Sequence, residues 1–346
     1  MATAESIIAL YTRADERLRE LIQQLEEGSW NRRRQEALLR QIEAIIEELT
    51  GKASNQMAAL VSDEYRAGAA AAVESITAVG IALESIEQTL RPLIHTRAAQ
   101  AIMDEAFYSI LEASEHMSAD AKRRITEATR RANEQSLIEG MNRRQATKQA
   151  IADLNAQGIT GMVTKNGARI PAMAYMAGVV HYHQRKAHVT GSENMATQNG
   201  YDLVYVNYVG ITCEYCATMQ GRVYSISGND ERFPKLERRP PYHAHCVHSL
   251  TPWIEEYATT DEVAKMVTDS NRPFKDNRTA RNIRRYNEIQ KVKSRKNETR
   301  KQWIRYKAAI PDAPNLRTFA SWKARNTQSY RDLQEDYRKI NAGGDR

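Results

Sequence analysis

The cysteines of this chain are confined to one short stretch, and this constrains the fold more than any other feature. The 346 residues include three cysteines, Cys213, Cys216 and Cys246. A Cys-x-x-Cys step lets two thiolates reach one ion from a single tight turn, and the segment from His243 to His248 adds a His-x-x-Cys step and a Cys-x-His step. The pattern therefore predicts two separate turns that meet around one metal ion.

Zinc is the metal that this donor set favours, because it accepts thiolates and imidazoles together. We expect Cys213, Cys216 and Cys246 as ligands, and either His243 or His248 as the fourth. A closed Cys3His set is typical of a structural site that stabilises a region with little apolar material. The odd cysteine count argues against a disulfide framework. The alternative is that the cysteines are small buried hydrophobes.

Catalytic chemistry has little support in the sequence. A catalytic zinc would need an open coordination position and a nearby acid or base, and Glu214 is the carboxylate inside the Cys-x-x-Cys turn. The His-x-Glu step of zinc deaminases does not precede Cys213, and the chain has neither a phosphate-cradling glycine-rich loop nor a Gly-x-Ser-x-Gly elbow. We interpret His181, His183 and His188, on an earlier predicted helix, as structural histidines.

The first half of the chain has apolar residues at helical spacing. An antiparallel hairpin of helices is predicted over 7–25 and 29–49. Ser29 is the predicted N-cap of the second helix, and Gly51 is expected to end that helix. Further helices are predicted over 62–90, where alanine allows close packing, and over 97–116, 118–140 and 142–155. Two short strands should flank the Asn166-Gly167 turn.

The second half mixes both kinds of element. A helix is predicted over 171–191, strands over 203–209 and 223–226, and helices over 279–309 and 318–340, with Thr259 and Glu262 at capping-box spacing. We predict a mostly α fold with a small α+β module. Its regions are a long N-terminal helical region (1–157), a zinc-knuckle-like α+β module (158–258) and a basic C-terminal helical tail (259–346).

The charge of the chain is unevenly distributed. The net charge is +7, yet residues 272–307 alone hold 14 Lys and Arg against 3 Asp and Glu. This run indicates contact with DNA or an acidic partner, and a solvated helix face is the alternative. The candidate contact residues are Arg281, Arg284, Arg285, Lys291, Lys293, Arg295, Lys296, Arg300 and Lys301. Tyr286, Trp303 and Tyr306 either stack on bases or pack inward.

Neither a membrane nor a small-molecule substrate is expected as a partner. The most apolar stretch, 67–83, is broken by Glu74 and is too short to span a bilayer, and the first residues lack the pattern of a signal peptide.

The residues around the cysteines resemble a known family. Cys213-x-x-Cys216, the run from Gln220 to Tyr224 and Pro240-Pro241-x-His243-x-x-Cys246 are similar to the signature of phage head-morphogenesis proteins of the Mu F-like minor capsid family. The run Gln220 to Gly228, with Cys246-Val247-His248-Ser249 and Pro252 downstream, is similar to the related phage minor capsid protein 2 family. The resemblance covers about 158–253.

The chain also departs from both patterns. The minor capsid protein 2 pattern usually has histidine in the place of Cys216, and the Mu F-like pattern usually has cysteine in the place of His248. The resemblance implies a non-enzymatic minor head component of the virion, in the capsid interior or at the portal vertex, and in the host cytoplasm during assembly. It also implies association with the portal, the procapsid and other capsid proteins, and support of DNA packaging or delivery; a basic tail that contacts double-stranded DNA is consistent with that role. The alternatives are a virion-carried zinc-dependent nuclease acting through His243 or His245, and a cytosolic zinc-knuckle adaptor.

Overall fold

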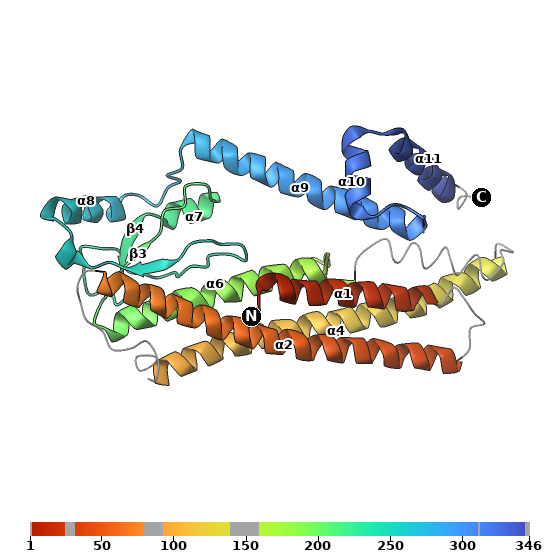
Figure 1. Ribbon diagram of the computed structural model, residues 1–346, viewed down its shortest axis with the longest axis horizontal. Coiled ribbons are helices and arrows are strands. Elements are labelled where there is room, and N and C mark those ends of the chain that lie inside the picture. Colours follow the sequence, from red (N-terminus) through yellow and green to blue (C-terminus); the bar gives the residue numbers. More distant parts are fainter. Residues whose placement is uncertain (1, 25–31, 79–92, 139–158, 311, 343–346) are drawn as a thin grey trace. The chain divides into compact units, whose positions relative to one another are not determined.

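The computed structural model describes residues 2–24, 32–78, 93–138, 159–310 and 312–342, and this part is mostly helical with a small amount of sheet, as predicted (Figure 1). Its helices are α1 (Ala4–Gln23), α2 (Arg32–Thr77), α4 (Leu93–Ile138), α6 (Ala172–Gln198), α7 (Glu214–Met219), α8 (Thr260–Asn271), α9 (Ala280–Ala309), α10 (Leu316–Arg325) and α11 (Gln328–Ala342), with a 3-10 turn η2 (Glu255–Tyr257). Its strands are β1 (Thr160–Val163), β2 (Arg169–Pro171), β3 (Leu203–Val206), β4 (Arg222–Ser225) and β5 (Leu250–Pro252). None of the helices described has an apolar stretch long enough to cross a bilayer.

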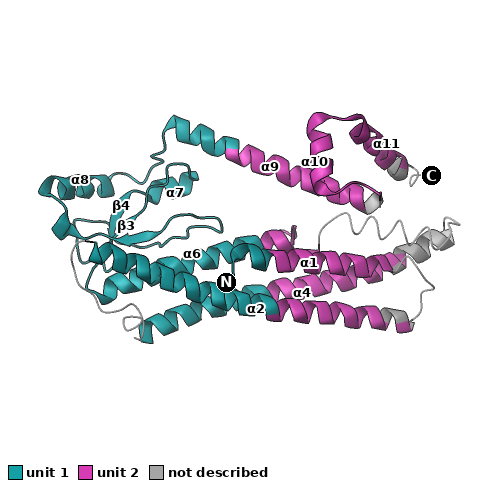
Figure 2. Ribbon diagram, viewed as in Figure 1, with its two compact units in different colours: residues 1–8, 52–110, 176–288 teal, residues 9–51, 111–175, 289–346 magenta. Residues whose placement is uncertain are grey.

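The chain divides into two compact units (Figure 2). Unit 1 contains residues 1–8, 52–110 and 176–288, and unit 2 contains residues 9–51, 111–175 and 289–346. The long helices α1, α2, α4, α6 and α9 each pass from one unit into the other.

Unit 1 contains a three-stranded antiparallel sheet in the order β4-β3-β5. Successive side chains of a strand face opposite sides of the sheet, and both sides are covered here. Val204 and Val206 pack with Val189 of α6, whereas Leu203 packs with Phe233 in a cluster that α8 joins through its partly buried apolar side chains. The sheet therefore lies between two helices.

The helices of unit 1 approach closely at glycines. A Cβ atom on Gly68 of α2 would lie 1.8 Å from the carbonyl oxygen of His188 on α6, and one on Gly191 of α6 would lie 2.1 Å from that of Tyr65 on α2. The close packing predicted for the alanine-rich helix over 62–90 is confirmed for the part of it that the structure describes. Beside this contact the Tyr65 hydroxyl lies 2.9 Å from Nδ1 of buried His95, so a polar network also joins α2 and α4.

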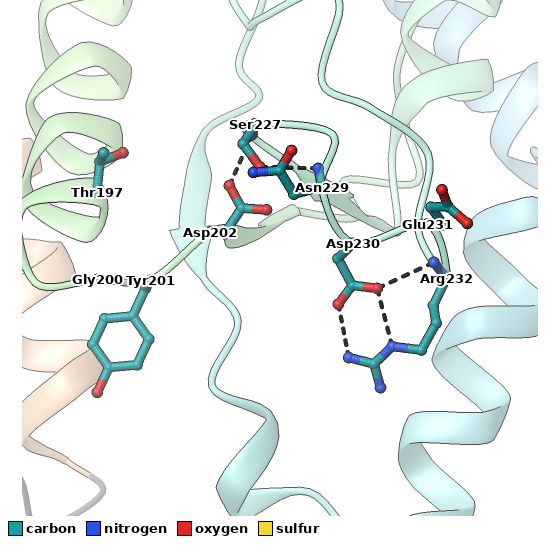
Figure 3. A pocket seen from close by; sticks show the side chains of 9 residues that line it. All are labelled: Thr197, Gly200, Tyr201, Asp202, Ser227, Asn229, Asp230, Glu231 and Arg232. Atoms are coloured by element: carbon teal, nitrogen blue, oxygen red, sulfur yellow. Dashed lines mark hydrogen bonds and ion pairs between the residues drawn. The ribbon is translucent and has the colours of Figure 1, made fainter.

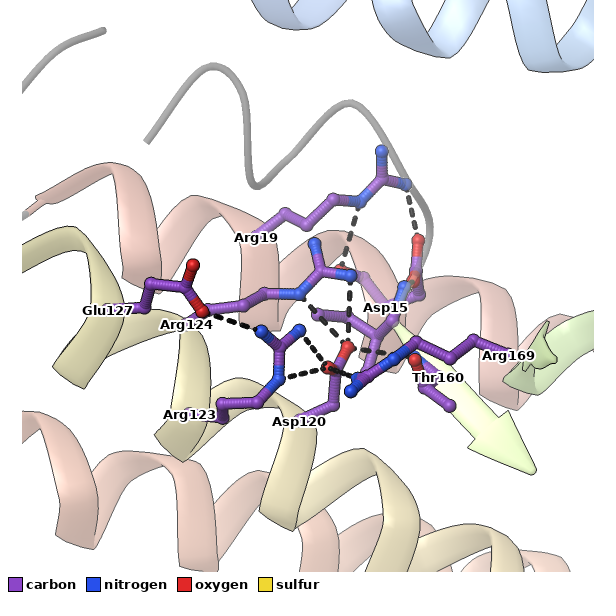
Figure 4. A network of polar contacts seen from close by, with 9 residues as sticks. Asp15, Arg19, Asp120, Arg123, Arg124, Glu127, Thr160 and Arg169 are labelled. Atoms are coloured by element: carbon purple, nitrogen blue, oxygen red, sulfur yellow. Dashed lines mark hydrogen bonds and ion pairs between the residues drawn. The ribbon is translucent and has the colours of Figure 1, made fainter. Parts of the chain in front are cut away.

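Unit 2 holds its β1–β2 hairpin through a buried carboxylate (Figure 4). Asp120 of α4 accepts hydrogen bonds from Arg124 Nε at 3.0 Å, from the Thr160 amide at 3.0 Å and from Arg169 Nη1 at 3.1 Å. Burial raises the pKa of the Asp120 carboxyl, but the charge of Arg124 and hydrogen bonds from Arg123 and Thr160 outweigh it and hold that pKa below its ordinary value. The carboxylate is therefore ionised in the folded protein.

The C-terminal helices of unit 2 have a small aromatic core. Tyr306 at the end of α9 packs with Phe319 of α10 and with Tyr330 of α11, and Trp303 Nε1 donates to the carbonyl of Pro314 at 2.8 Å. Trp303 and Tyr306 therefore pack inward, which is the second of the two arrangements considered for them.

Several predicted elements have other limits in the structure. Gly51 lies inside α2, Ser118 lies inside α4, and the single helix predicted over 318–340 is two helices, α10 and α11, separated by Asn326 with φ of 47°. The hairpin at Asn166-Gly167, the strands β3 and β4, the capping box at the start of α8 and the basic helix α9 are confirmed. Ser29, most of 79–92 and the helix predicted over 142–155 lie outside the described residues.

Candidate metal centre

The sheet topology brings the two cysteine segments together. β3 is the central strand, and its last residue, Val206, pairs with the first residue of β4, Arg222, and with the first residue of β5, Leu250. The chain that leaves β3 and the chains that enter β4 and β5 therefore lie at one end of the sheet. Cys213 and Cys216 lie between β3 and β4, and Cys246 lies shortly before β5.

The first turn has the geometry of a metal-binding hook. Cys213 is the N-cap of α7, and its Sγ accepts a hydrogen bond from the Cys216 amide at 3.4 Å. Gly210 and Gly221, on either side of this hook, have φ of +75° and +68°, which favour glycine. The turn therefore points both thiols to the same side.

The five predicted ligands lie together around Cys216. Its Sγ is 3.9 Å from Cys246 Sγ and 3.2 Å from His243 Nε2. Cys213 Sγ lies 3.4 Å from His243 Nε2, and Cys246 Sγ lies 3.5 Å from His248 Nδ1. The donor atoms form two groups of three, Cys213 with Cys216 and His243, and Cys216 with Cys246 and His248; the atoms lie within 4.8 Å of one another inside each group but not across the two.

The separations among Cys216, Cys246 and His248 fit a tetrahedral zinc site, whereas Cys213 Sγ would have to move closer to Cys246 and His248 to complete it. With Zn–S of about 2.3 Å and Zn–N of about 2.0 Å, tetrahedral angles place two sulfurs about 3.8 Å apart and a sulfur and a nitrogen about 3.5 Å apart. The observed contacts of 3.9 Å between Cys216 and Cys246, and of 3.5 Å between Cys246 and His248, agree with these values. Cys216, Cys246 and His248 are also buried, so a bound ion would be shielded from water on that side.

The thiols affect each other's ionisation. The hydrogen bond from Cys216 lowers the pKa of the Cys246 thiol well below its ordinary value, and the same contact raises the pKa of Cys216. Cys246 therefore ionises more readily than Cys216. A metal cation that displaces the proton of Cys216 would also remove the hydrogen bond between the two sulfurs, which is what opposes ionisation of Cys216.

Sequence reasoning missed the role of Gln220, whose side chain is wholly buried. Its Oε1 accepts from the amide of Val209 at 2.9 Å and lies 3.1 Å from Nε2 of His248, and its Nε2 donates to Asn277 Oδ1 at 3.3 Å. The Arg222 side chain nearby is also wholly buried. The only sequence signal was the Gln-Gly-Arg run itself, which gives no indication of these partners.

The other histidines have separate partners. His183 Nδ1 lies 2.9 Å from the carbonyl oxygen of Val179, and His188 Nδ1 lies 3.6 Å from Glu64. The His181 ring lies against the ring of His245, with centroids 6.1 Å apart. In the part of the chain that the structure describes, none of these histidines belongs to a group of three metal-ligand side chains. Their structural role stays a prediction.

An acidic pocket lies beside the sheet (Figure 3). Asp202 accepts hydrogen bonds from Ser225 Oγ at 2.5 Å and from the Ser227 amide at 2.8 Å, and Asp230 pairs with Arg232 at 2.7 Å. Because both aspartates are already partnered within the protein, the cysteine cluster is the stronger candidate for a site.

The predicted DNA-contact residues lie along α9, and much of this helix is exposed to solvent. Every residue from 290 to 298 is exposed. The predicted residues are exposed at Arg281, Arg284, Arg285, Lys291, Lys293, Arg295, Lys296 and Lys301, and Arg300 is half-buried.

Comparison with known proteins identifies the family. The family model described as phage minor capsid protein 2 matches residues 2–335, nearly the whole chain. No curated protein and no solved structure matches the chain. The match extends well beyond the 158–253 segment that carries the resemblance in the sequence, and it includes the helices of both units. The chain belongs to the phage minor capsid protein 2 family.

Proposed function

We propose that this protein is a non-enzymatic structural component of the phage head whose small sheet is cross-linked by one zinc ion. The family match over residues 2–335 supports a structural role in the phage particle. Five ligand-type side chains compete for the four positions of a tetrahedral zinc, which favours a saturated site without an open position for substrate. For the same reason the zinc-dependent nuclease is the weaker alternative.

The zinc ion would fasten the loops at one end of the sheet. The three strands have four, four and three residues, so the loops between them account for most of this region. Cys213 and Cys216 would hold the loop after β3, and Cys246 with His243 or His248 would hold the loop before β5. Bound zinc supplies a cross-link whose binding free energy becomes folding free energy.

Metal content and chelation test this role. Protein purified without chelators should contain about one zinc per chain, and chelation should unfold the sheet region cooperatively while the helices of unit 2 persist. Cys246→Ser should reproduce the effect of chelation. Absence of bound metal in such a preparation would refute the zinc cross-link, without affecting the structural role in the head.

The exposed part of α9 is proposed to contact packaged double-stranded DNA. Lys291, Lys293, Arg295 and Lys296 lie within two turns and are all exposed. Changing these four to glutamine should weaken binding to double-stranded DNA and flatten its salt dependence by about 0.9 in log–log slope for each phosphate that the protein no longer neutralises.

A control variant distinguishes a local surface from net charge. It changes four exposed basic residues that lie far apart in the sequence, Arg13, Arg66, Lys165 and Lys265, to glutamine and removes the same charge. Equal effects of the two variants would show that α9 has no special role.

The place of the protein in the particle is also a proposal. We infer a virion location, in the capsid interior or at the portal vertex, with the portal and other capsid proteins as partners and the host cytoplasm as the site of assembly. Cross-linking of purified particles followed by mass spectrometry should join this chain to portal or capsid subunits. The division into regions 1–157, 158–258 and 259–346 stays a prediction.

A further inference from the structure

Five candidate ligands surround a site that takes four, and the two histidines differ in how their rings are hydrogen-bonded. A histidine binds a metal through a ring nitrogen that has no hydrogen, while its other N–H donates to an acceptor that fixes the ring. The partners of His243 and His248 therefore indicate which ring offers a free lone pair to the cysteines.

The orientation of the Gln220 amide is fixed by the backbone. Its Oε1 accepts from the amides of Val209 at 2.9 Å and Gly210 at 3.3 Å, and its Nε2 donates to Asn277 Oδ1 at 3.3 Å. The atom that faces His248 Nε2 at 3.1 Å is therefore an acceptor. Because an acceptor requires a donor opposite it, Nε2 of His248 bears the hydrogen and the neutral ring has a free lone pair on Nδ1.

That lone pair faces the cysteines. Nδ1 of His248 lies 3.5 Å from Cys246 Sγ, and the side chains of His248, Cys216 and Cys246 form one of the two groups of three. His248 is wholly buried, so Gln220 and Cys246 define its surroundings instead of water. Nδ1 is therefore oriented as a metal ligand.

His243 has the opposite arrangement. Its Nδ1 accepts a hydrogen bond from the amide of His245 at 3.3 Å, which places the hydrogen of the neutral ring on Nε2. Nε2 lies 3.4 Å from Cys213 Sγ and 3.2 Å from Cys216 Sγ, so it presents an N–H group to both sulfurs. His243 is also exposed, so water can take the place of its ring beside the sulfurs.

We propose that the metal ligands are the Sγ atoms of Cys213, Cys216 and Cys246 and Nδ1 of His248, and that His243 lies outside this set and donates Nε2–H to the Cys213 and Cys216 thiolates. This assignment rests on the proposed zinc site. Three thiolates and one Zn²⁺ have a net charge of −1, and an N–H donor beside two of the sulfurs stabilises that charge. Gln220 is a positioning residue that holds the His248 ring.

Nitrogen-15 NMR of the zinc-loaded wild-type protein tests the assignment without a mutation. Long-range ¹H–¹⁵N spectra distinguish a histidine bound through Nδ1 with Nε2–H from one bound through Nε2 with Nδ1–H. We expect one metal-bound histidine of the first kind. A metal-bound histidine of the second kind would overturn the proposal, and so would the absence of any metal-bound histidine in protein that contains zinc.

Substitutions give a second, independent measurement. Zinc affinity, measured by competition with a chromophoric chelator, should fall at least about 100-fold in His248→Ala and about 10- to 100-fold in Gln220→Ala, which removes the acceptor for Nε2. His243→Ala should retain one zinc per chain with an affinity within about 10-fold of wild type. A larger loss in His243→Ala than in His248→Ala would overturn the assignment, whereas a wild-type protein that binds no zinc would refute the proposed metal site itself.

Discussion

Replacing Arg222 of β4 with lysine should weaken the attachment of residues 270–273 to the sheet. This segment contains the end of α8 and the start of the connection to α9. The Arg222 side chain is wholly buried. Its guanidinium lies over the Phe274 ring, 4.2 Å from the ring centroid, and burial lowers its pKa, although a guanidinium stays charged in proteins. Its nitrogens donate at 2.7 to 3.0 Å to four main-chain carbonyl oxygens, those of Thr218, Ser270, Arg272 and Pro273.

The size of the effect follows from these four acceptors. A lysine ammonium has three donors on one atom, so it can reach about two of the four carbonyl oxygens that the planar guanidinium of Arg222 reaches. A buried carbonyl that loses its donor costs about 1–3 kcal/mol. The bond to Ser270 is buried and the other three are part-buried, so the cost for each of those lies near the lower end of this range. Arg222→Lys should therefore lower the free energy of unfolding of unit 1 by roughly 2–4 kcal/mol, although the charge is conserved.

Arg232→Lys is the matched control. Arg232 also makes several hydrogen bonds, to Asp230 and Glu255 at 2.7 Å, but half of its side chain is exposed. Exposed ion pairs contribute at most about 1 kcal/mol, so this variant should remain close to wild type. The two variants make the same chemical change, and only the burial and the kind of acceptor differ.

Urea unfolding and hydrogen exchange together measure the effect. The Val223 amide donates to the buried Ser270 Oγ at 2.9 Å, so it reports directly on the attachment of the segment. In Arg222→Lys this amide should exchange faster by a factor that matches the loss of unfolding free energy. If Arg222→Lys and Arg232→Lys have the same small effect, the inference that Arg222 fastens this segment is wrong.

Two further substitutions, Gly68→Ala in unit 1 and Asp120→Asn in unit 2, test the packing of each unit, and Gly51→Ala is the control for the first. Gly68→Ala should destabilise unit 1 by more than about 2 kcal/mol, because its Cβ would lie 1.8 Å from the His188 carbonyl oxygen, whereas Gly51→Ala in the same helix has nothing within 4 Å and should stabilise by about 0.5–1 kcal/mol in thermal unfolding. Asp120→Asn should cost about 3–5 kcal/mol because buried Arg124 loses its carboxylate partner. The folded pKa of Asp120 lies below the unfolded value, so its contribution is complete above the unfolded pKa and is lost as pH falls through the folded pKa. Acid titration of unfolding should show this loss in wild type and not in Asp120→Asn.

The long helices that the structure describes were predictable from periodicity, and the starts of α6, α8 and α9 were too, but several other helix ends were not. Gly51 and Ser118 have the residue types of a helix end and a helix start, yet both lie inside helices of 46 residues. A glycine costs about 1 kcal/mol in a helix interior, and buried Leu49 and Ala53 on either side of Gly51 offset this by packing. Asn326 shows the reverse case, because its left-handed φ of 47° divides a segment whose apolar pattern is continuous.

The metal site shows the same division between local and long-range determinants. The spacing of Cys213 and Cys216 predicts a hook because both thiols depend on one turn. The choice between the two histidines rests instead on Gln220, which reaches His248 across 28 residues and Asn277 across 57. No local pattern distinguishes a glutamine that will be buried at the junction of three loops from one that stays on the surface. Only the strand order β4-β3-β5 brings these loops together, so the ligand set depends on the fold as much as on the motif.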